Sequence, residues 1–148
     1  MELFKELAST DYYFLGFNKE SHILLMKLMG DMTDEQYKES WKRSFQITYE
    51  KGIEKLIIDQ REIGNVSFAA RAWVMVKMYP KIKKELSPNL MGAIISSSHI
   101  IHRSGVQYLV KAFQRVSGYQ IKFQDSYESS ITWLNEVERL QQTGQVIN

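Results

Sequence analysis

The stretch from residue 55 to residue 80 has the clearest succession of apolar and polar segments in the chain. It begins with the uninterrupted apolar run Leu56-Ile57-Ile58, which predicts a short strand over residues 55–59 that is covered on both faces. A polar segment follows, and Gly64-Asn65 marks a turn within it. The pattern therefore predicts a buried strand, a polar loop and a helix. Ligands or partners usually meet the loop of such a unit.

The helix of this unit is predicted over residues 68–79, with Ser67 as its N-cap. Pro80 falls where the helix should end or kink, because proline has no amide hydrogen to donate, and residues 81–86 are predicted to form a further helical turn. We expect one apolar face of the helix to pack against the sheet. Its side chains recur at three- and four-residue spacing: Ala69, Ala72, Trp73, Val76 and Tyr79.

The first fifty residues contain two apolar segments and one amphipathic segment. Residues 1–10 are predicted to be a weakly anchored lead-in. Residues 11–18 and 22–29 are rich in aromatic and aliphatic side chains, and the short polar turn between them predicts an antiparallel hairpin. Thr33 and Gln36 then match a capping box, which predicts a helix that ends near residue 52.

The second half of the chain again alternates strand and helix. Residues 90–96 are predicted to form a strand. Ser104 with Gln107 matches a second capping box, for a helix that ends before Gly118. Residues 119–123 are predicted to form the next strand.

The last helix completes the predicted order of elements. Asp125 with Glu128 is predicted to cap it, and it runs to about residue 140. From the third strand onward strands alternate with helices, which favours parallel pairing through right-handed crossovers. We therefore predict an α/β fold in a single domain over residues 1–148, with its core at about 11–140. The predicted architecture is a mixed five-stranded sheet with about four helices packed on it.

Composition excludes several classes of protein. The chain has no cysteine, so disulfides, thiolate metal sites and cysteine nucleophiles are excluded. No apolar run approaches the roughly 18 residues of a membrane-spanning helix, and the first residues lack the apolar region of a secretory signal. We therefore expect a cytoplasmic protein that does not span a membrane.

The net charge of +2 is unevenly distributed along the chain. Residues 51–122 carry twelve Lys/Arg against four Asp/Glu, a net +8, whereas each flanking segment carries a net −3. This basic segment either attracts an anionic partner or is a solvated helix surface whose lysines suit the helix dipole. The sequence contains no phosphate-binding loop or dinucleotide fingerprint, and we expect no nucleic-acid partner.

Polar side chains follow the predicted central strand. Asp59, Arg61 and Glu62 either form a recognition site, hold acid–base groups, or satisfy loop amides and pair with one another. Ser67 is either a phosphoacceptor at a helix N-terminus or the cap of that helix. The capping role alone is enough to account for a serine at this position. An aspartate at this position would be expected to cap equally well.

Two further groups are candidates for a site. Ser96-Ser97-Ser98 and the spacing His99-x-x-His102 suggest a hydrolase or a metal site. The chain has no Gly-x-Ser-x-Gly elbow and spacing places no third ligand, so binding of an anion or a partner is the preferred interpretation. Phe68 and Met75 are expected to fill the core, and if exposed they would instead form a docking surface or the mouth of a pocket.

The ordered set of these motifs resembles the STAS superfamily, and most closely its SpoIIAA-like branch of small bacterial proteins. The resemblance implies a mixed sheet with helices packed against it. The matching features include the opening hairpin, the acidic start of the first helix, the strand Leu56-Ile57-Ile58-Asp59 with its loop into Val66-Ser67-Phe68-Ala69-Ala70-Arg71, the strand Ala93-Ile94-Ile95, and Phe123-Gln124-Asp125-Ser126 before Ile131-Thr132-Trp133-Leu134.

The resemblance also implies a function. Classical members of the family are antagonists of anti-sigma factors, are not enzymes, and offer the loop and helix after the third strand to a protein partner. A serine at that helix entry, in the pattern Asp-Ser-Ser/Thr-Gly, is phosphorylated, which abolishes binding. Here an ungapped match places Phe68 at the phosphorylated position and Ala70 at the glycine, so we expect partner recognition without this switch. The SpoIIAA-like branch is also similar to lipid-binding Sec14-type domains, which implies an apolar ligand as the alternative.

The leading hypothesis is a non-enzymatic protein-interaction module of the bacterial cytoplasm, with no cofactor and no metal. The alternative is a carrier or sensor of a small apolar or lipid-like ligand bound between the helices and the sheet. A second copy of the chain is one option for the partner. The residues predicted to contact the partner or ligand are Asp59, Arg61, Glu62, Ser67, Phe68, Arg71, Met75, Ser97 and His99.

Overall fold

The computed structural model describes residues 3–97 and 106–144. Its strands, in chain order, are β1 (Lys5–Ser9), β2 (Tyr13–Asn18), β3 (Ile23–Gly30), β4 (Lys55–Ile63), β5 (Met91–Ile95) and β6 (Gln120–Gln124). Its helices are α1 (Asp34–Lys51), α2 (Phe68–Lys77), α3 (Tyr79–Glu85), α5 (Val106–Ser117) and α6 (Tyr127–Gln142).

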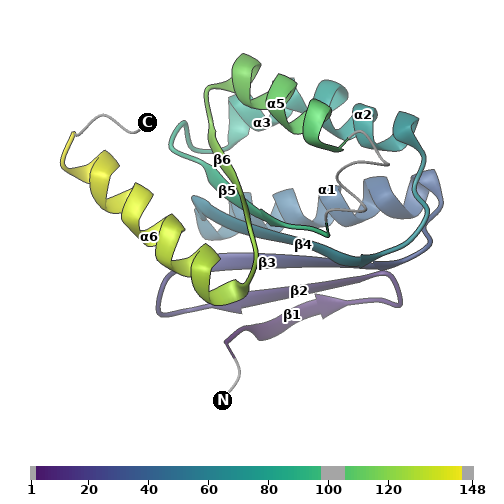
Figure 1. Ribbon diagram of the computed structural model, residues 1–148, viewed down its shortest axis with the longest axis horizontal. Coiled ribbons are helices and arrows are strands. Elements are labelled where there is room, and N and C mark those ends of the chain that lie inside the picture. The colour runs from purple at the N-terminus through teal and green to yellow at the C-terminus, as the bar shows by residue number, and fades with distance from the viewer. Residues whose placement is uncertain (1–2, 98–105, 145–148) are drawn as a thin grey trace.

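The six strands form one sheet in the order β1-β2-β3-β4-β5-β6, with helices on both of its faces (Figure 1). β1, β2 and β3 pair antiparallel, and β3, β4, β5 and β6 pair parallel. The mixed α/β architecture that the sequence predicts is therefore confirmed. The predicted number of strands is wrong, because the sheet has six strands and not five.

β1 is the strand that the sequence analysis missed. Its residues, KELAS, include none of the β-branched and aromatic side chains that mark strands, and the pattern predicts a weakly anchored lead-in instead. The structure pairs β1 with β2 so that Lys5 lies opposite Phe17. Phe4, just before the strand, is buried against Gly16, where an added Cβ would lie 2.8 Å from the Phe4 Cβ. Long-range pairing and packing therefore hold a segment whose local pattern is weak.

The sheet separates two hydrophobic cores. On one face, side chains of α1, α2, α3 and α5 pack over strand residues such as Leu24, Met26 and Ile58. On the opposite face α6 is the one described helix, and it packs through Leu134 against a smaller core around Ile57. Figure 1 shows this division, with α6 well separated from the other helices. The parallel strands β4 and β5 are covered on both faces, which explains their nearly continuous apolar runs.

The helix ends largely follow the capping signals in the sequence. The predicted capping box opens α1, and Ser67 caps α2 as predicted. Pro80 lies in the first turn of α3 and separates that helix from α2. α6 is capped by Ser126, whose side chain accepts a hydrogen bond from the amide of Ser129, and not by Asp125. The last cap therefore lies one residue later than predicted.

Candidate functional site

Asp59, Arg61 and Glu62 lie within β4 and not after it, because the strand continues to Ile63. The apolar run ends earlier, but pairing with β3 continues past an irregularity of register next to Lys27. The predicted end of this strand is therefore wrong. Asp59 is buried, whereas Arg61 and Glu62 are exposed, and Glu62 forms an ion pair with Lys27.

The Asp59 carboxylate accepts hydrogen bonds from two residues of the same chain, Arg61 and Tyr127. Arg61 donates its backbone N–H and Nε to Oδ1, at 3.1 and 3.0 Å, and Nη2 to Oδ2 at 2.9 Å. The Tyr127 hydroxyl, from α6, donates to Oδ2 at 2.6 Å. Burial raises the pKa of Asp59, but the hydrogen bonds from Arg61 and Tyr127 outweigh it and hold the pKa below its usual range. The Asp59 carboxylate, held ionised by Arg61 and Tyr127, joins β4 to α6. Because these hydrogen bonds already engage it, it is poorly placed to act as an acid or base.

The loop between β4 and α2 is tied to the loop before α1. The amide of Asn65 donates a hydrogen bond to Asp31 Oδ1 at 2.7 Å. Ser67 Oγ accepts from the amide of Ala70 at 3.0 Å and donates to Asp34 Oδ1 at 2.7 Å. Sequence reasoning missed both aspartates as parts of this site, because each lies more than thirty positions from its partner. The only available signal was the acidic start of the first predicted helix.

α2 is buried on a different face from the one that its sequence predicts. Ala70, Arg71 and Val74 are buried, whereas Val76 is 64% exposed and Trp73 is half-buried. Apolar side chains occur nearly all around this helix, so their spacing alone does not fix which face turns inward. The structure turns the arginine inward and leaves much of the predicted core face in solvent.

The outer surfaces of α2 and α5 carry most of the exposed large apolar side chains that the structure describes. Phe68 is 54% and Val76 is 64% exposed on α2, and Tyr108 is 72% and Val116 is 68% exposed on α5. The two helices pack side by side (Figure 1). We call these four residues the α2–α5 surface. Phe68 was predicted as a contact residue, whereas Tyr108 was missed because a single exposed tyrosine has no distinctive pattern.

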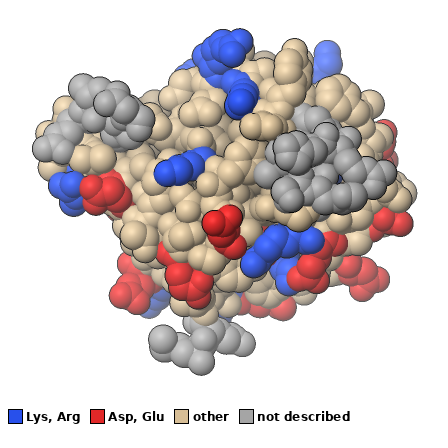
Figure 2. Space-filling model, in the orientation of Figure 1, with Lys and Arg blue, Asp and Glu red and all other residues tan. Residues whose placement is uncertain are grey.

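This surface is basic as well as apolar. Exposed cations accompany it on the same helices, at Lys77, Lys111 and Arg115, and α3 adds three more exposed lysines. Glu85 is the single acidic residue within α2, α3 and α5. In Figure 2 most of the Lys and Arg side chains in view lie in the upper half of the molecule, and Asp and Glu gather in the lower half.

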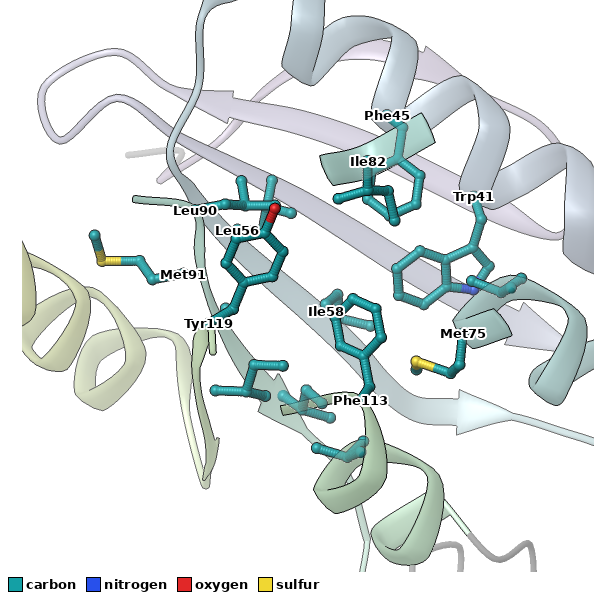
Figure 3. A pocket seen from close by; sticks show the side chains of 15 residues that line it. Trp41, Phe45, Leu56, Ile58, Met75, Ile82, Leu90, Met91, Phe113 and Tyr119 are labelled. Atoms are coloured by element: carbon teal, nitrogen blue, oxygen red, sulfur yellow. The ribbon is translucent and has the colours of Figure 1, made fainter. Parts of the chain in front are cut away.

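Met75 is half-buried and lines an apolar cavity of about 60 Å³ between the helices and the sheet (Figure 3). Arg71 and Gln60 line a smaller neighbouring cavity of about 20 Å³. Sites for drug-sized ligands have volumes of roughly 300–1,000 Å³. The larger cavity is therefore too small for a lipid in this conformation.

The remaining predicted site residues follow β5. Ser97 is half-buried after the end of that strand. His99, His102, Arg103 and Ser104 lie outside the described residues. Within residues 3–97 and 106–144, no group of three His, Asp or Glu side chains is placed to hold a metal ion. In the same ranges, none of the helices combines the length and apolar character needed to cross a bilayer.

No family model matches the chain, and no curated protein matches it. Its fold is similar to a solved structure from Shewanella loihica PV-4, described as an uncharacterized protein of the DUF3478 family with a SpoIIAA-like fold. The two share 21% sequence identity with a TM-score of 0.57, over 86% of this chain and 98% of the other. At this identity the comparison shows the fold alone. The chain has a SpoIIAA-like fold, as the resemblance of its motifs implied.

Proposed function

We propose that this protein acts by binding a protein partner through the α2–α5 surface, next to the helix entry at Ser67, and without catalysis of its own. The observation that carries the proposal is the exposure of Phe68, Val76, Tyr108 and Val116 on two adjacent helices. Exposed apolar side chains that are grouped on one surface mark interaction sites more often than scattered ones do. Aromatic residues such as Phe68 and Tyr108 are also enriched in protein interfaces.

The positive charge around the α2–α5 surface indicates which kind of protein partner it would bind. The exposed lysines and arginines of α2, α3 and α5 accompany a single acidic residue, Glu85. An apolar segment flanked by acidic side chains would complement this surface in both respects. Its attraction to the lysines would be screened by salt, so the affinity should fall as ionic strength rises.

The polar residues at the end of β4 support a binding role over catalysis. Asp59 has its hydrogen bonds inside the fold, from Arg61 and Tyr127. Ser67 is engaged both as a helix cap and as a donor to Asp34. Both side chains thus have structural roles, which favours binding over catalysis at this place.

The test compares two charge substitutions at equally exposed aromatic positions. Phe68→Asp alters the α2–α5 surface, and Tyr49→Asp is its matched control, because Tyr49 is 60% exposed on α1. Tagged full-length wild type and both variants are expressed in the native cells and purified at low salt, and the co-purifying protein is identified and quantified by mass spectrometry. Circular dichroism and a urea denaturation curve establish that each variant is folded.

Wild type and Tyr49→Asp should recover the same partner, and Phe68→Asp should lose at least nine tenths of it. Tyr108→Asp should reproduce that loss from the neighbouring helix. Equal recovery by all variants would reject the α2–α5 surface as the docking site. Binding of wild type to phosphatidylglycerol vesicles, lost in Phe68→Asp, with no protein recovered, would replace the protein partner by a membrane surface.

A further inference from the structure

Arg71 is a buried cation that pairs with no anion among the residues that the structure describes. The structure describes three buried charged residues, and two of them have an opposite charge within reach: Lys55 is paired with Glu138, and Asp59 with Arg61. Arg71, 3% exposed, forms no ion pair with any residue in the described part of the chain. Buried charges are normally compensated, so this exception calls for an explanation.

The surroundings of Arg71 compensate it only in part. Its Nη1 donates a hydrogen bond to Gln60 Oε1 at 3.0 Å, and the Gln60 side chain is itself buried. The guanidinium lies 5.6 Å from the ring centroid of Tyr37, a cation–π contact. Its Nε has no hydrogen-bond partner within residues 3–97 and 106–144. A neutral amide and a tyrosine, whose ring and hydroxyl both interact with the arginine, replace the carboxylate that a buried arginine normally faces.

The unpaired polar atoms of the described core belong to residues that line the two cavities. Three buried side-chain N or O atoms there have no hydrogen-bond partner: Arg71 Nε, Trp41 Nε1 and Tyr119 Oη. Arg71 lines the small cavity, Tyr119 lines the larger apolar cavity, and Trp41 lines both. The first two atoms can only donate. The Tyr37 hydroxyl interacts with both side chains but carries no charge, so the donors at the polar end of the site can still take an anionic acceptor.

The two cavities are adjacent parts of one site. Their shared lining residues are Trp41, Ile58, Met75, Ile94 and Val110. Figure 3 shows Trp41 and Met75 on one side of the larger cavity, facing Phe113 and Ile58. The walls beyond Trp41 are apolar, so an occupant would present an acceptor to Arg71 and hydrocarbon to the rest.

We propose that Arg71, together with Gln60 and Trp41, binds the carboxylate of a small apolar monocarboxylic acid whose hydrocarbon part fills the adjacent cavity. Guanidinium and carboxylate match in charge and in planar geometry, and the pair is strongest where water is excluded. This ligand site lies beneath α2 and goes beyond the protein-binding role proposed for the outer surface of the same helix.

The volume sets the size of the acid. The two cavities together offer about 80 Å³. Because a water molecule needs roughly 10–15 Å³ on this measure, there is room for about five to eight non-hydrogen atoms. Two of these are the carboxylate oxygens, which leaves a chain of about three to six carbons. Hexanoate is the upper end of this range, and decanoate lies well beyond it.

The first test keeps the protein unchanged and varies the ligand. Full-length wild type is titrated with hexanoate, hexanamide and decanoate, and binding is followed by isothermal titration calorimetry. Hexanoate should bind saturably with one site per chain, hexanamide at least tenfold more weakly because it lacks the charge, and decanoate at least tenfold more weakly because it exceeds the cavity. Equal affinity for hexanoate and hexanamide, or no saturable binding of hexanoate at 20 mM, would overturn the proposal and leave a buried water as the partner of Arg71.

The second test removes the cation. Arg71→Met keeps much of the side-chain volume without the charge, and Lys77→Met is its control, because Lys77 is an exposed cation on the same helix. Hexanoate should raise the melting temperature of wild type and of Lys77→Met and leave that of Arg71→Met unchanged. If Arg71→Met does not fold, Gln60→Leu takes its place with an expected loss of at least fivefold in affinity. Retained binding in the variant used would show that the acid binds elsewhere.

Discussion

The Ser67 hydroxyl joins the first turns of two helices: it accepts a hydrogen bond from the amide of Ala70 in α2 and donates one to Asp34 Oδ1 in α1. The donated bond places a carboxylate 2.7 Å from the hydroxyl oxygen. A negative charge at position 67, from an aspartate or a phosphate, would satisfy the helix amides and at the same time face Asp34. A negative charge at position 67 would therefore stabilise the helix end as a cap and destabilise the fold through repulsion from Asp34.

The first prediction separates these two effects by substitution. Ser67→Ala should lower the free energy of unfolding by about 1 kcal/mol, because the cap is lost. Ser67→Asp should be less stable than Ser67→Asn, since both can cap but only the aspartate repels Asp34. The sequence alone predicts a nearly neutral Ser67→Asp. Urea denaturation of the three variants at low salt measures the order of their free energies of unfolding.

Asp34→Asn provides the control for this prediction. In the Ser67→Asp background it should recover stability, and the double-mutant cycle should give a coupling that shrinks as salt is added. If Ser67→Asp proves as stable as Ser67→Asn in both backgrounds, the two side chains do not interact and the proximity of Asp34 has no effect on a phosphorylated Ser67.

Much of the site was predictable where the signal is local. The cap at Ser67 and the turn before it follow from residue types and spacing, as does the position of Phe68 at the start of the helix. The hairpin was predictable for the same reason, because its two strands are joined by a short turn. The parallel strands pair over long stretches of chain, but the alternation of apolar runs with helices predicts them.

The features that were not predictable depend on distant pairing. β1 is held by a hairpin partner, and Asp34 meets Ser67 across 33 positions. The buried face of α2 was predicted incorrectly because its outer side is also apolar. The spacing of the apolar residues therefore fits either of two faces as the buried one. Arg71 was predicted to contact a partner or ligand, and nothing in the local pattern indicated that the structure would bury its side chain.

The second prediction concerns acid stability. The folded pKa of Asp59 lies below its unfolded value, which is about 3.9. The ionised form of Asp59 thus stabilises the fold, fully above the unfolded pKa and progressively less as pH falls through the folded pKa. Wild type should lose stability as pH falls below about 5, and Asp59→Asn should lose less over the same range, although it is less stable at pH 7.

Urea denaturation at several pH values between 3 and 7 measures this difference, in which the contributions of the other carboxylates cancel. Tyr127→Phe removes one donor to Asp59 and should cost about 1.5–3 kcal/mol at pH 7, because a hydrogen bond to a charged group is lost. Parallel acid profiles for wild type and Asp59→Asn would show that internal hydrogen bonds do not hold Asp59 ionised.

The third prediction concerns the ammonium group that ties β4 to α6. Lys55 Nζ donates to Glu138 Oε1 at 2.9 Å and to Asn135 Oδ1 at 3.0 Å, and the lysine side chain is buried. Glu138→Ala leaves this charge without its anion, whereas Lys55→Met replaces it by an apolar side chain of similar length. We therefore expect Glu138→Ala to be the more destabilising change. Thermal and urea denaturation measure the loss of stability in each variant. A larger loss in Lys55→Met than in Glu138→Ala would contradict the prediction.

The fourth prediction compares two tryptophans, Trp41 on α1 and Trp73 on α2. Trp41 is 5% exposed in the core, whereas Trp73 is half-buried, with Lys38 Nζ at 4.9 Å and Lys42 Nζ at 5.2 Å from its ring centroid. Trp41→Ala should cost about 3–5 kcal/mol, because it enlarges a cavity. Trp73→Ala should cost about 1–2 kcal/mol, because only part of its apolar area and two cation–π contacts near the surface are lost.

Urea denaturation measures both costs, and iodide quenching provides an independent control. Trp73, which remains in Trp41→Phe, should be quenched more strongly than Trp41, which remains in Trp73→Phe, and Trp133 contributes equally to both variants. The sequence-based assignment of Trp73 to the buried face of α2 would instead require costs of equal size and equal protection from iodide. Since the structure turns Ala70 and Val74 toward the sheet, a large loss of stability in Trp73→Ala would mean that α2 is rotated about its axis from the position described here.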